Sequence, residues 1–278
     1  MLQNLKLFIL LSLLTGLFLL VGYSLGGRNG LYMALFASLI MQGISFWNSD
    51  KIALSMNRAE PISESQAPEL YAMLRKLCQK ANLPLPKLYI TPESSPNAFA
   101  TGRDPNHSAV AVTQGLLQTL NQSELEGVLA HELGHIKNRD VFISTVAAVL
   151  AGAISTLTQF AYFLGGSRNR EEQSPFGYLG LLVSVFVAPM AALIIQFAIS
   201  RSREYKADAT AAELTGNPQG LVNALTKLHN FAHHQEPDVL QPAFSSLYIV
   251  NPFSGQFLAE LMSTHPSVEK RIEKLLEN

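Results

Sequence analysis

The sequence predicts a mainly α-helical integral membrane protein that carries one α+β domain with a small sheet at the membrane surface. Charged residues make up only 15% of the 278 residues, against about 25% in an average soluble protein. Four windows contain no Asp, Glu, Lys or Arg. The polar segments between and after them are together long enough to bury one good core. The first two predicted spans therefore occupy residues 1–49, and the first part of the domain occupies residues 50–140. Two more predicted spans occupy residues 141–200, and the second part of the domain occupies residues 201–278.

Each charge-free window is long enough to cross a bilayer, which takes about 20 apolar residues. A charge at the middle of a span costs about 2.5–3.5 kcal/mol, so four such gaps are hard to obtain by chance. A cleaved signal peptide is the alternative for the first window. That window lacks an A-x-A-like cleavage site and a second window follows almost at once, which favours an anchor. The predicted spans are approximately residues 7–27, 29–49, 141–165 and 177–200.

Basic residues beside the predicted spans orient the chain. The side that holds both termini and the polar segments would carry eight Lys or Arg residues near the membrane, whereas the other side has only Arg28, Arg168 and Arg170. The positive-inside rule therefore predicts cytoplasmic termini and a cytoplasmic domain. Cys78 is the only cysteine, so no internal disulfide is possible and a packed, buried thiol is the simplest interpretation.

Periodic patterns place the elements of the polar domain. They predict helices over 68–81, 218–231 and 266–276, and short strands over 87–91 and 108–113. Asn217 is expected to cap the second of these helices, with proline at its first position. Inward-facing side chains are expected at Leu70, Met73, Leu74 and Leu77 in the first helix and at Val268, Ile272 and Leu276 in the last.

A further helix is expected to begin at Ser123 as its N-cap, with Glu126 completing a capping box. This helix carries His131-Glu132-Leu133-Gly134-His135, a complete H-E-x-x-H motif. Histidines four residues apart lie on one helix face, so both imidazoles can reach one Zn²⁺. Glu132 is turned aside by about 100°, so it can miss the metal and act as general base on a water that the metal activates. The alternative is a surface helix that carries these residues by chance.

A catalytic zinc site needs three protein ligands and one open position. The best candidate for the third ligand is Glu204. Asp208 lies four residues further along the same helix face, where it can hydrogen-bond a ligand histidine and fix its tautomer. The alternative is that both carboxylates are solvated and pair with Arg201, Arg203 or Lys206. The histidine pair requires a third ligand, which favours one zinc ion bound per chain.

His107, His229 and His233 have simpler interpretations than metal binding. His229 and His233 are also four residues apart, but no carboxylate follows His229 and the segment looks like a helix end, where cations are favourable. His107, which follows Asp104, is expected in a turn. No basic run or glycine-rich phosphate loop is present, so nucleic acid is not an expected partner.

With this motif, the downstream glutamate and four predicted spans, the chain resembles the HtpX family of bacterial membrane zinc proteases, within the gluzincin group that includes the CAAX prenyl endopeptidases. The resemblance covers nearly the whole chain and rests on residues 96–102, 131–135, 202–208 and 264–266. It implies a zincin-like domain, Zn²⁺ held by His131, His135 and Glu204, and Glu132 as the catalytic acid/base. It also implies quality control of membrane proteins under stress, in the inner membrane with the site facing the cytosol. Residues 165–177 and 229–257 carry no motif of this family.

Two residues on the substrate side acquire a role if the resemblance holds. Asn97 begins a segment that ends at Gly102 and could form an exposed edge strand, which would bind an extended polypeptide by β-augmentation. An ordinary turn is the alternative for this segment. His265 could donate to the oxyanion, and a helix-entry residue before Pro266 is its alternative.

The expected function is that of a zinc endopeptidase acting on membrane or misfolded polypeptides beside the bilayer. A site-specific peptidase of CAAX type is the nearest alternative, although four spans leave little room for a large enclosed chamber. A non-catalytic membrane metal sensor or transporter is the other alternative. Transport would call for ionisable residues within the spans, and a sensor would have no need of Glu132. The sequence specifies neither the cleavage preference nor the oligomeric state.

Overall fold

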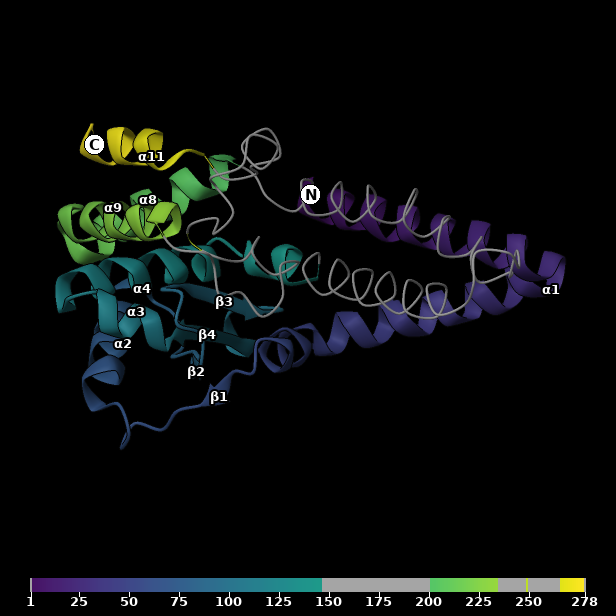
Figure 1. Cartoon of the computed structure of the whole chain (residues 1–278), viewed down its shortest axis with the longest axis horizontal. Coiled ribbons are helices and arrows are strands. Elements are labelled where there is room, and N and C mark those ends of the chain that lie inside the picture. The colour runs from purple at the N-terminus through teal and green to yellow at the C-terminus, as the bar shows by residue number, and fades with distance from the viewer. Residues whose placement is uncertain (1, 147–200, 235–248, 250–265, 278) are drawn as a thin grey trace.

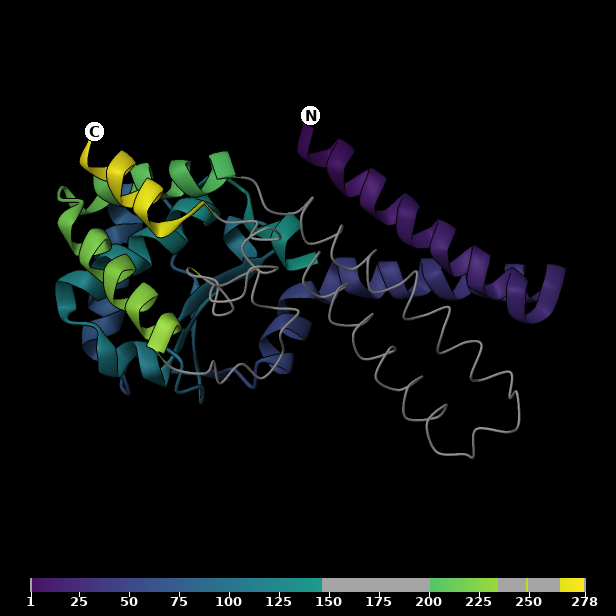
Figure 2. The same cartoon turned by 45° about the horizontal axis from the view of Figure 1, so that its top comes forward.

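The first element is a long broken helix that stands apart from the rest of the fold. The structure is a computed structural model that describes residues 2–146, 201–234, 249 and 266–277. Helix α1 (Leu2–Met56) loses helical geometry at Gly26 and Gly27, and Gly27 takes a φ of 55° that favours glycine. Both views show α1 running away from the other elements, turning at its far end and running back (Figures 1 and 2). The break falls at the end of the first charge-free window, directly before Arg28.

The two arms of α1 contact each other but leave much apolar surface exposed. Gln42 Nε2 donates to Thr15 Oγ1 at 2.9 Å, and the arms approach so closely at Gly22 and Gly30 that neither position has room for a Cβ. Within the described residues, no single helix has the length and apolarity of a span, although Gly26–Ile44 and Trp47–Met56 pass together as a pair bent by 79°. The predicted spans 141–165 and 177–200 lie outside the described residues from position 147 on. The large apolar side chains exposed on α1 are Phe8, Ile9, Leu20, Tyr23, Tyr32, Met33, Phe36, Leu39, Ile40, Ile44 and Trp47.

The domain contains one four-stranded sheet. Its strands β1 (Glu60–Pro61), β2 (Lys87–Thr91), β3 (Ala98–Gly102) and β4 (Ser108–Thr113) are arranged in the order β1-β2-β4-β3. The β2–β4 pair is parallel and the other two pairs are antiparallel. The strands predicted at 87–91 and 108–113 are therefore confirmed.

Strand β3 lies at an edge of the sheet, but the expectation that it is exposed is wrong. All five of its residues are buried. Phe99 packs in a cluster with Leu54 of α1, whereas Ala98 and Ala100 on the opposite face belong to the core beneath the helices. Both faces of this edge strand are covered because α1 returns to the domain on one side and a central helix crosses it on the other.

That central helix is α4 (Gln122–Lys137), which carries the H-E-x-x-H motif. Its N-cap is Asn121 rather than Ser123. Asn121 Oδ1 accepts from the Glu124 N–H at 3.0 Å, and the Glu124 carboxylate accepts from the Asn121 N–H at 2.9 Å. The predicted capping box is therefore displaced by two residues, since asparagine caps as well as serine. Glu126 instead pairs with Lys76 on the surface at 3.1 Å.

Helix α2 (Pro68–Ala81) has the predicted bounds, and its predicted inward-facing residues and Cys78 are buried. Two short elements, η1 (Pro105–His107) and α3 (Gln114–Thr119), flank β4. His107 lies in the expected turn, where its Nδ1 is 2.9 Å from the Asp104 carboxylate.

The second part of the domain stacks on α4. Helices α8 (Arg201–Thr215) and α9 (Gln219–His234) pack against α4, and α11 (Val268–Leu276) packs against both of them (Figure 1). Asn217 Oδ1 accepts from the Gln219 N–H at 2.9 Å, as expected for the cap of α9. Two glycines of α4 permit this close packing. A Cβ on Gly127 would lie 2.6 Å from the Leu221 nitrogen, and one on Gly134 would lie 3.0 Å from the Ala207 Cα.

The C-terminal helix differs from its predicted pattern. It begins two residues late, because Ser267 caps it, and Leu276 is 60% exposed rather than buried. The buried positions are Val268, Arg271 and Leu275. The predictions for Val268 and Ile272 hold, since Val268 is buried and Ile272 packs partly buried against the core. The helix differs at Leu276, which is exposed, and at Arg271, which points into the fold.

Candidate metal centre

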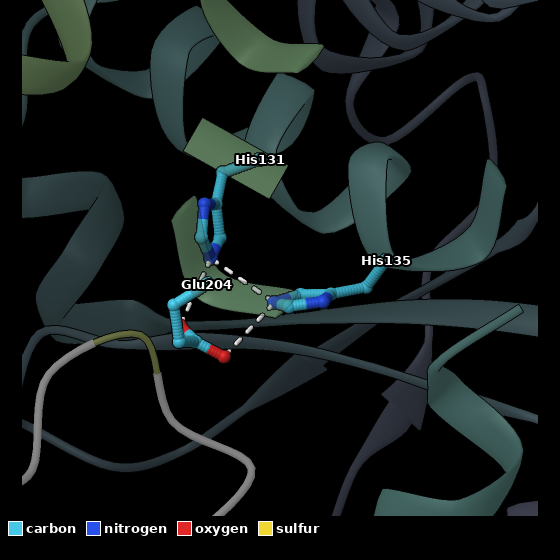
Figure 3. Close-up of side chains that lie close together, drawn as sticks. All are labelled: His131, His135 and Glu204. Carbon is cyan, nitrogen blue, oxygen red and sulfur yellow. Dashed lines mark hydrogen bonds and ion pairs between the residues drawn. The ribbon is translucent and has the colours of Figure 1, made fainter. Parts of the chain in front are cut away.

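Three predicted ligand atoms converge where α4 faces α8. His131 and His135 extend from one face of α4, with their Nε2 atoms 3.2 Å apart and their ring planes at 87° (Figure 3). Glu204 reaches the same point from α8, with carboxylate oxygens 3.7 Å from His131 Nε2 and 3.6 Å from His135 Nε2. Gly134 contributes indirectly, since its lack of a side chain allows the backbone of α8 to approach α4.

The arrangement fits a small divalent cation. Ligand atoms placed about 2.0–2.1 Å from one ion in a tetrahedral arrangement are separated by about 3.3 Å. The two Nε2 atoms are 3.2 Å apart, and each lies 3.6–3.7 Å from a different oxygen of the Glu204 carboxylate, which is close to that value. Two imidazole nitrogens and a carboxylate are ligands typical of a catalytic site. No other group of this kind occurs among the described residues. His229 Nε2 instead lies 3.3 Å from a Glu269 oxygen at the surface.

Glu132 lies beside this cluster without belonging to it. Its carboxylate is buried, and it accepts a hydrogen bond from the Ala100 N–H of β3. Burial raises the pKa of Glu132 to about 8, and the nearby Glu204 adds to this rise, whereas His135 opposes it. A pKa in this range suits a group that takes up a proton and gives it back near neutral pH.

A buried ion pair supports His131 from behind. His131 Nδ1 lies 2.8 Å from Asp208 Oδ1, on the side of the ring away from the cluster. Arg271 holds both oxygens of Asp208, with Nε at 2.9 Å and Nη2 at 2.6 Å. Arg271 is only 1% exposed. It was not found by sequence analysis, although its position three residues after Val268, within the apolar pattern of the last helix, was a usable signal.

This pair fixes the protonation of His131. Burial and the positive charge of Arg271 lower the pKa of His131 to about 4, so the ring is neutral. Burial would raise the pKa of Asp208, but Arg271 and the hydrogen bonds bring it down to about 2, so Asp208 is ionised. An ionised carboxylate can only accept, and therefore His131 Nδ1 carries the proton. The lone pair of Nε2 then points towards Glu204 and His135.

Asn97 occupies a structural junction near this ion pair. Its Oδ1 accepts from the Ala98 N–H at 3.0 Å and from the Ile249 N–H at 3.1 Å. Arg271 Nη1 in turn donates to the Ile249 carbonyl at 2.8 Å. Ile249 is thus hydrogen-bonded both to Asn97, at the start of β3, and to Arg271, which supports His131 through Asp208. His265, the second predicted residue on the substrate side, lies outside the described residues.

Comparison with known proteins places this geometry in a family. Residues 64–278 match the model of peptidase family M48. The chain belongs to peptidase family M48. A protease HtpX homolog of Pelotomaculum thermopropionicum is 51% identical to this M48 chain over 276 residues, which cover 98% of each protein. A protease HtpX homolog of Thermococcus sibiricus is 48% identical over 271 residues, covering 96% of this chain and 93% of its own.

A solved structure shares the fold. The crystal structure of S. mikatae Ste24p aligns with 98% of this chain at a TM-score of 0.52 and 20% sequence identity, which shows a likeness of fold alone. The chain spans 64% of the length of that structure. Membership of family M48 makes this chain a metalloprotease, and His131, His135 and Glu204 are the group that could hold its metal.

Proposed function

We propose that this M48 peptidase is a zinc-dependent endopeptidase that cuts misfolded or damaged membrane proteins at the cytoplasmic face of the membrane. The observation that carries this proposal is the convergence of His131, His135 and Glu204 beside a buried Glu132 that is not part of the ligand group. A binding protein that only held a metal would need the first three residues and not the fourth.

The residues divide the chemistry between them. When bound, Zn²⁺ supplies Lewis acidity, which polarises the scissile carbonyl and acidifies a water molecule. Glu132 takes the proton of the attacking water and returns it to the leaving amine. Its buried position keeps bulk water from competing for that proton. Asp208 holds the Nδ1 proton of His131, so that Nε2 stays available as a ligand.

The outer edge of β3 supports a role in binding the polypeptide. The Thr113 N–H donates to the Asn97 carbonyl at 2.9 Å. In the antiparallel register, the backbone groups of residues 97, 99 and 101 are therefore the ones that form hydrogen bonds with β4. The backbone groups of Ala98, Ala100 and Gly102 then point away from β4, and the Ala100 N–H reaches Glu132. An extended substrate paired along this edge would bring a peptide bond to the catalytic glutamate.

Further support comes from outside the centre. The exposed apolar side chains of α1 form the kind of surface that a bilayer would cover, in agreement with the charge-free windows of the sequence. The distribution of basic residues favours the cytoplasmic face. Asn97 and His265 are proposed to act on the substrate side, the first by positioning the start of β3 and the second as a donor to the oxyanion.

The test is digestion of an unfolded, fluorescently labelled protein by the detergent-solubilised full chain. The wild type should cleave it, a chelator should stop cleavage, and added Zn²⁺ should restore it. Glu132→Gln should bind one Zn²⁺ per chain, as the wild type does, and cleave nothing. Cleavage by zinc-loaded Glu132→Gln would contradict the proposed mechanism. Zinc binding without any cleavage by the wild type would favour a metal sensor.

A site-specific peptidase of CAAX type remains the second candidate, favoured by the fold shared with Ste24p. The same preparation should be offered a prenylated peptide with a C-terminal CAAX sequence. Cleavage of the unfolded protein at many positions supports quality control, whereas cleavage of the prenylated peptide alone would support the second candidate.

A further inference from the structure

The turn that ends α4 returns the chain to His135. The Arg139 N–H donates to the Ile136 carbonyl at 3.1 Å, and the Asp140 N–H donates to the His135 carbonyl at 3.0 Å. Arg139 adopts the left-handed conformation, with a φ of 59°. This conformation and the two hydrogen bonds together make a Schellman motif. Glycine usually occupies this position, because a residue with a side chain costs roughly 1–2 kcal/mol there. The turn therefore holds Asp140 close to the motif at an energetic cost.

Asp140 lies on the side of His135 away from the ligand cluster. Its carboxylate oxygen is 3.7 Å from His135 Nδ1, while Nε2 of the same ring faces Glu204. Asp140 is only 4% exposed. The separation is too long for a direct hydrogen bond, so the negative charge of the carboxylate acts on the Nδ1 side of the ring at a distance.

The surroundings of the two histidines are alike. His131 has Asp208 at its Nδ1, and His135 has Asp140 at the corresponding nitrogen. Each carboxylate also interacts with an arginine, which is buried in one case and partly buried in the other. Arg271 holds Asp208, and Arg203, which precedes Glu204 on α8, attracts Asp140. The positive charge of the arginine that precedes the third ligand, Glu204, thus favours the ionised carboxylate behind the second ligand, His135.

We propose that Asp140 is a positioning residue of the metal centre, which orients His135 and keeps the proton on its Nδ1 so that Nε2 is free to bind metal. The inference rests on the proposed zinc site. A carboxylate behind a ligand histidine fixes its tautomer and raises its basicity, and removal of such a partner typically lowers metal affinity about 10–100-fold. The sequence predicted that Asp208 would support one of the two ligand histidines in this way, whereas Asp140 is placed by the turn alone.

A simpler role for Asp140 is that of an N-cap. Residues 141–146 are helical, and Asp140 directly precedes them. Asparagine and serine cap helices about as well as aspartate, so Asp140→Asn and Asp140→Ser preserve that role while removing the charge. A capping role alone predicts unchanged metal affinity in both variants.

The experiment measures Zn²⁺ affinity by competition with a chromophoric chelator, in the full detergent-solubilised chain. The Asp140 variants are combined with Glu132→Gln to prevent self-cleavage. Both should bind Zn²⁺ about 10–100-fold more weakly than Glu132→Gln alone. The visible spectrum of the Co²⁺-loaded protein should also shift, which a loss of fold stability by itself would not produce. If the asparagine variant does not fold, the serine variant carries the test.

Glu124→Gln is the matched control, because Glu124 is a buried carboxylate at the opposite end of α4, paired with Lys227 at 2.8 Å. It should lower thermal stability and leave Zn²⁺ affinity within about twofold of its parent. Affinities for both Asp140 variants within twofold of their parent would overturn the role of Asp140 and leave the proposed function standing. Failure of Glu132→Gln and of the wild type to bind Zn²⁺ would overturn the proposed function, and the role of Asp140 with it.

Discussion

Replacing Arg271 with methionine removes a buried guanidinium while keeping an unbranched apolar stem. The arginine is 1% exposed and makes two charge-assisted hydrogen bonds to Asp208 and one bond to the Ile249 carbonyl. In the variant, Asp208 stays buried beside His131 with no cation to balance it. We therefore expect the fold around the centre to lose much of its stability.

The size of the loss follows from these contacts. Hydrogen bonds to charged groups contribute about 1.5–3 kcal/mol each, and removing one partner of a buried ion pair costs about 3–5 kcal/mol. A typical protein is stable by only about 5–15 kcal/mol, so the variant is expected to be marginal. For a domain of this size, the midpoint of thermal unfolding should fall by roughly 6–20 °C.

Arg75→Met is the matched control for this measurement. Arg75 pairs with Glu64 at 2.8 Å, but the two side chains are 49% and 60% exposed. Exposed pairs contribute about 0–1 kcal/mol, so this variant should unfold near the wild-type midpoint. Both variants are compared by denaturant and thermal unfolding in detergent, in the Glu132→Gln background.

Joint replacement of Asp208 and Arg271 by leucine and methionine sharpens the test. It removes both charges, and apolar replacement of a buried pair is often close to neutral for stability. The double variant should therefore be more stable than Arg271→Met alone. A loss of less than about 1 kcal/mol in Arg271→Met would refute the buried ion pair as a determinant of stability.

Three other predictions concern different parts of the fold. Burial raises the pKa of the Cys78 thiol to about 11, so the protonated thiol should resist alkylation at pH 8 in the native protein and react rapidly in denaturant. Rapid labelling of the native protein would contradict its burial. Gly127→Ala should destabilise the fold by about 1–3 kcal/mol, although alanine favours helices, because its Cβ would overlap the backbone of α9. Gln122→Ala, at an exposed position of the same helix, should change the free energy of unfolding by less than about 0.5 kcal/mol. His229→Asn should leave zinc stoichiometry at one ion per chain, and loss of a bound zinc in elemental analysis would assign His229 to a metal site.

Sequence analysis located the elements whose signals are local. The bounds of α2 and of strands β2 and β4 follow from periodicity and turn residues within each segment. The spacing of His131 and His135 places them on one helix face whatever the rest of the chain does. Glu204 could be selected because its helix offers carboxylates at the matching spacing.

Errors arose where two local signals competed or where the packing partner was distant in sequence. Asn121 and Ser123 are both good N-caps with a glutamate three residues later, and the structure uses the first. The last helix was given an apolar stripe that ends at Leu276, but the packed face contains Arg271 because Asp208 offers it a buried counter-charge. Strand β3 was expected to be exposed, yet α1 returns to cover it from more than 40 residues away.

The sequence by itself identified the candidate donor atoms, since helix geometry places the two histidines of the H-E-x-x-H motif on one face and the pair calls for a third ligand such as Glu204. The packing of α8 on α4 brings Glu204 to that pair. Only the tertiary structure decided how those donors are supported. Arg271 lies 63 residues after Asp208, and Asp140 acquires its role from a turn that happens to fold back on His135. The contribution of a buried charge to stability depends on the groups that surround it once water is excluded. Those neighbours are distant in sequence and cannot be identified from the order of the residues.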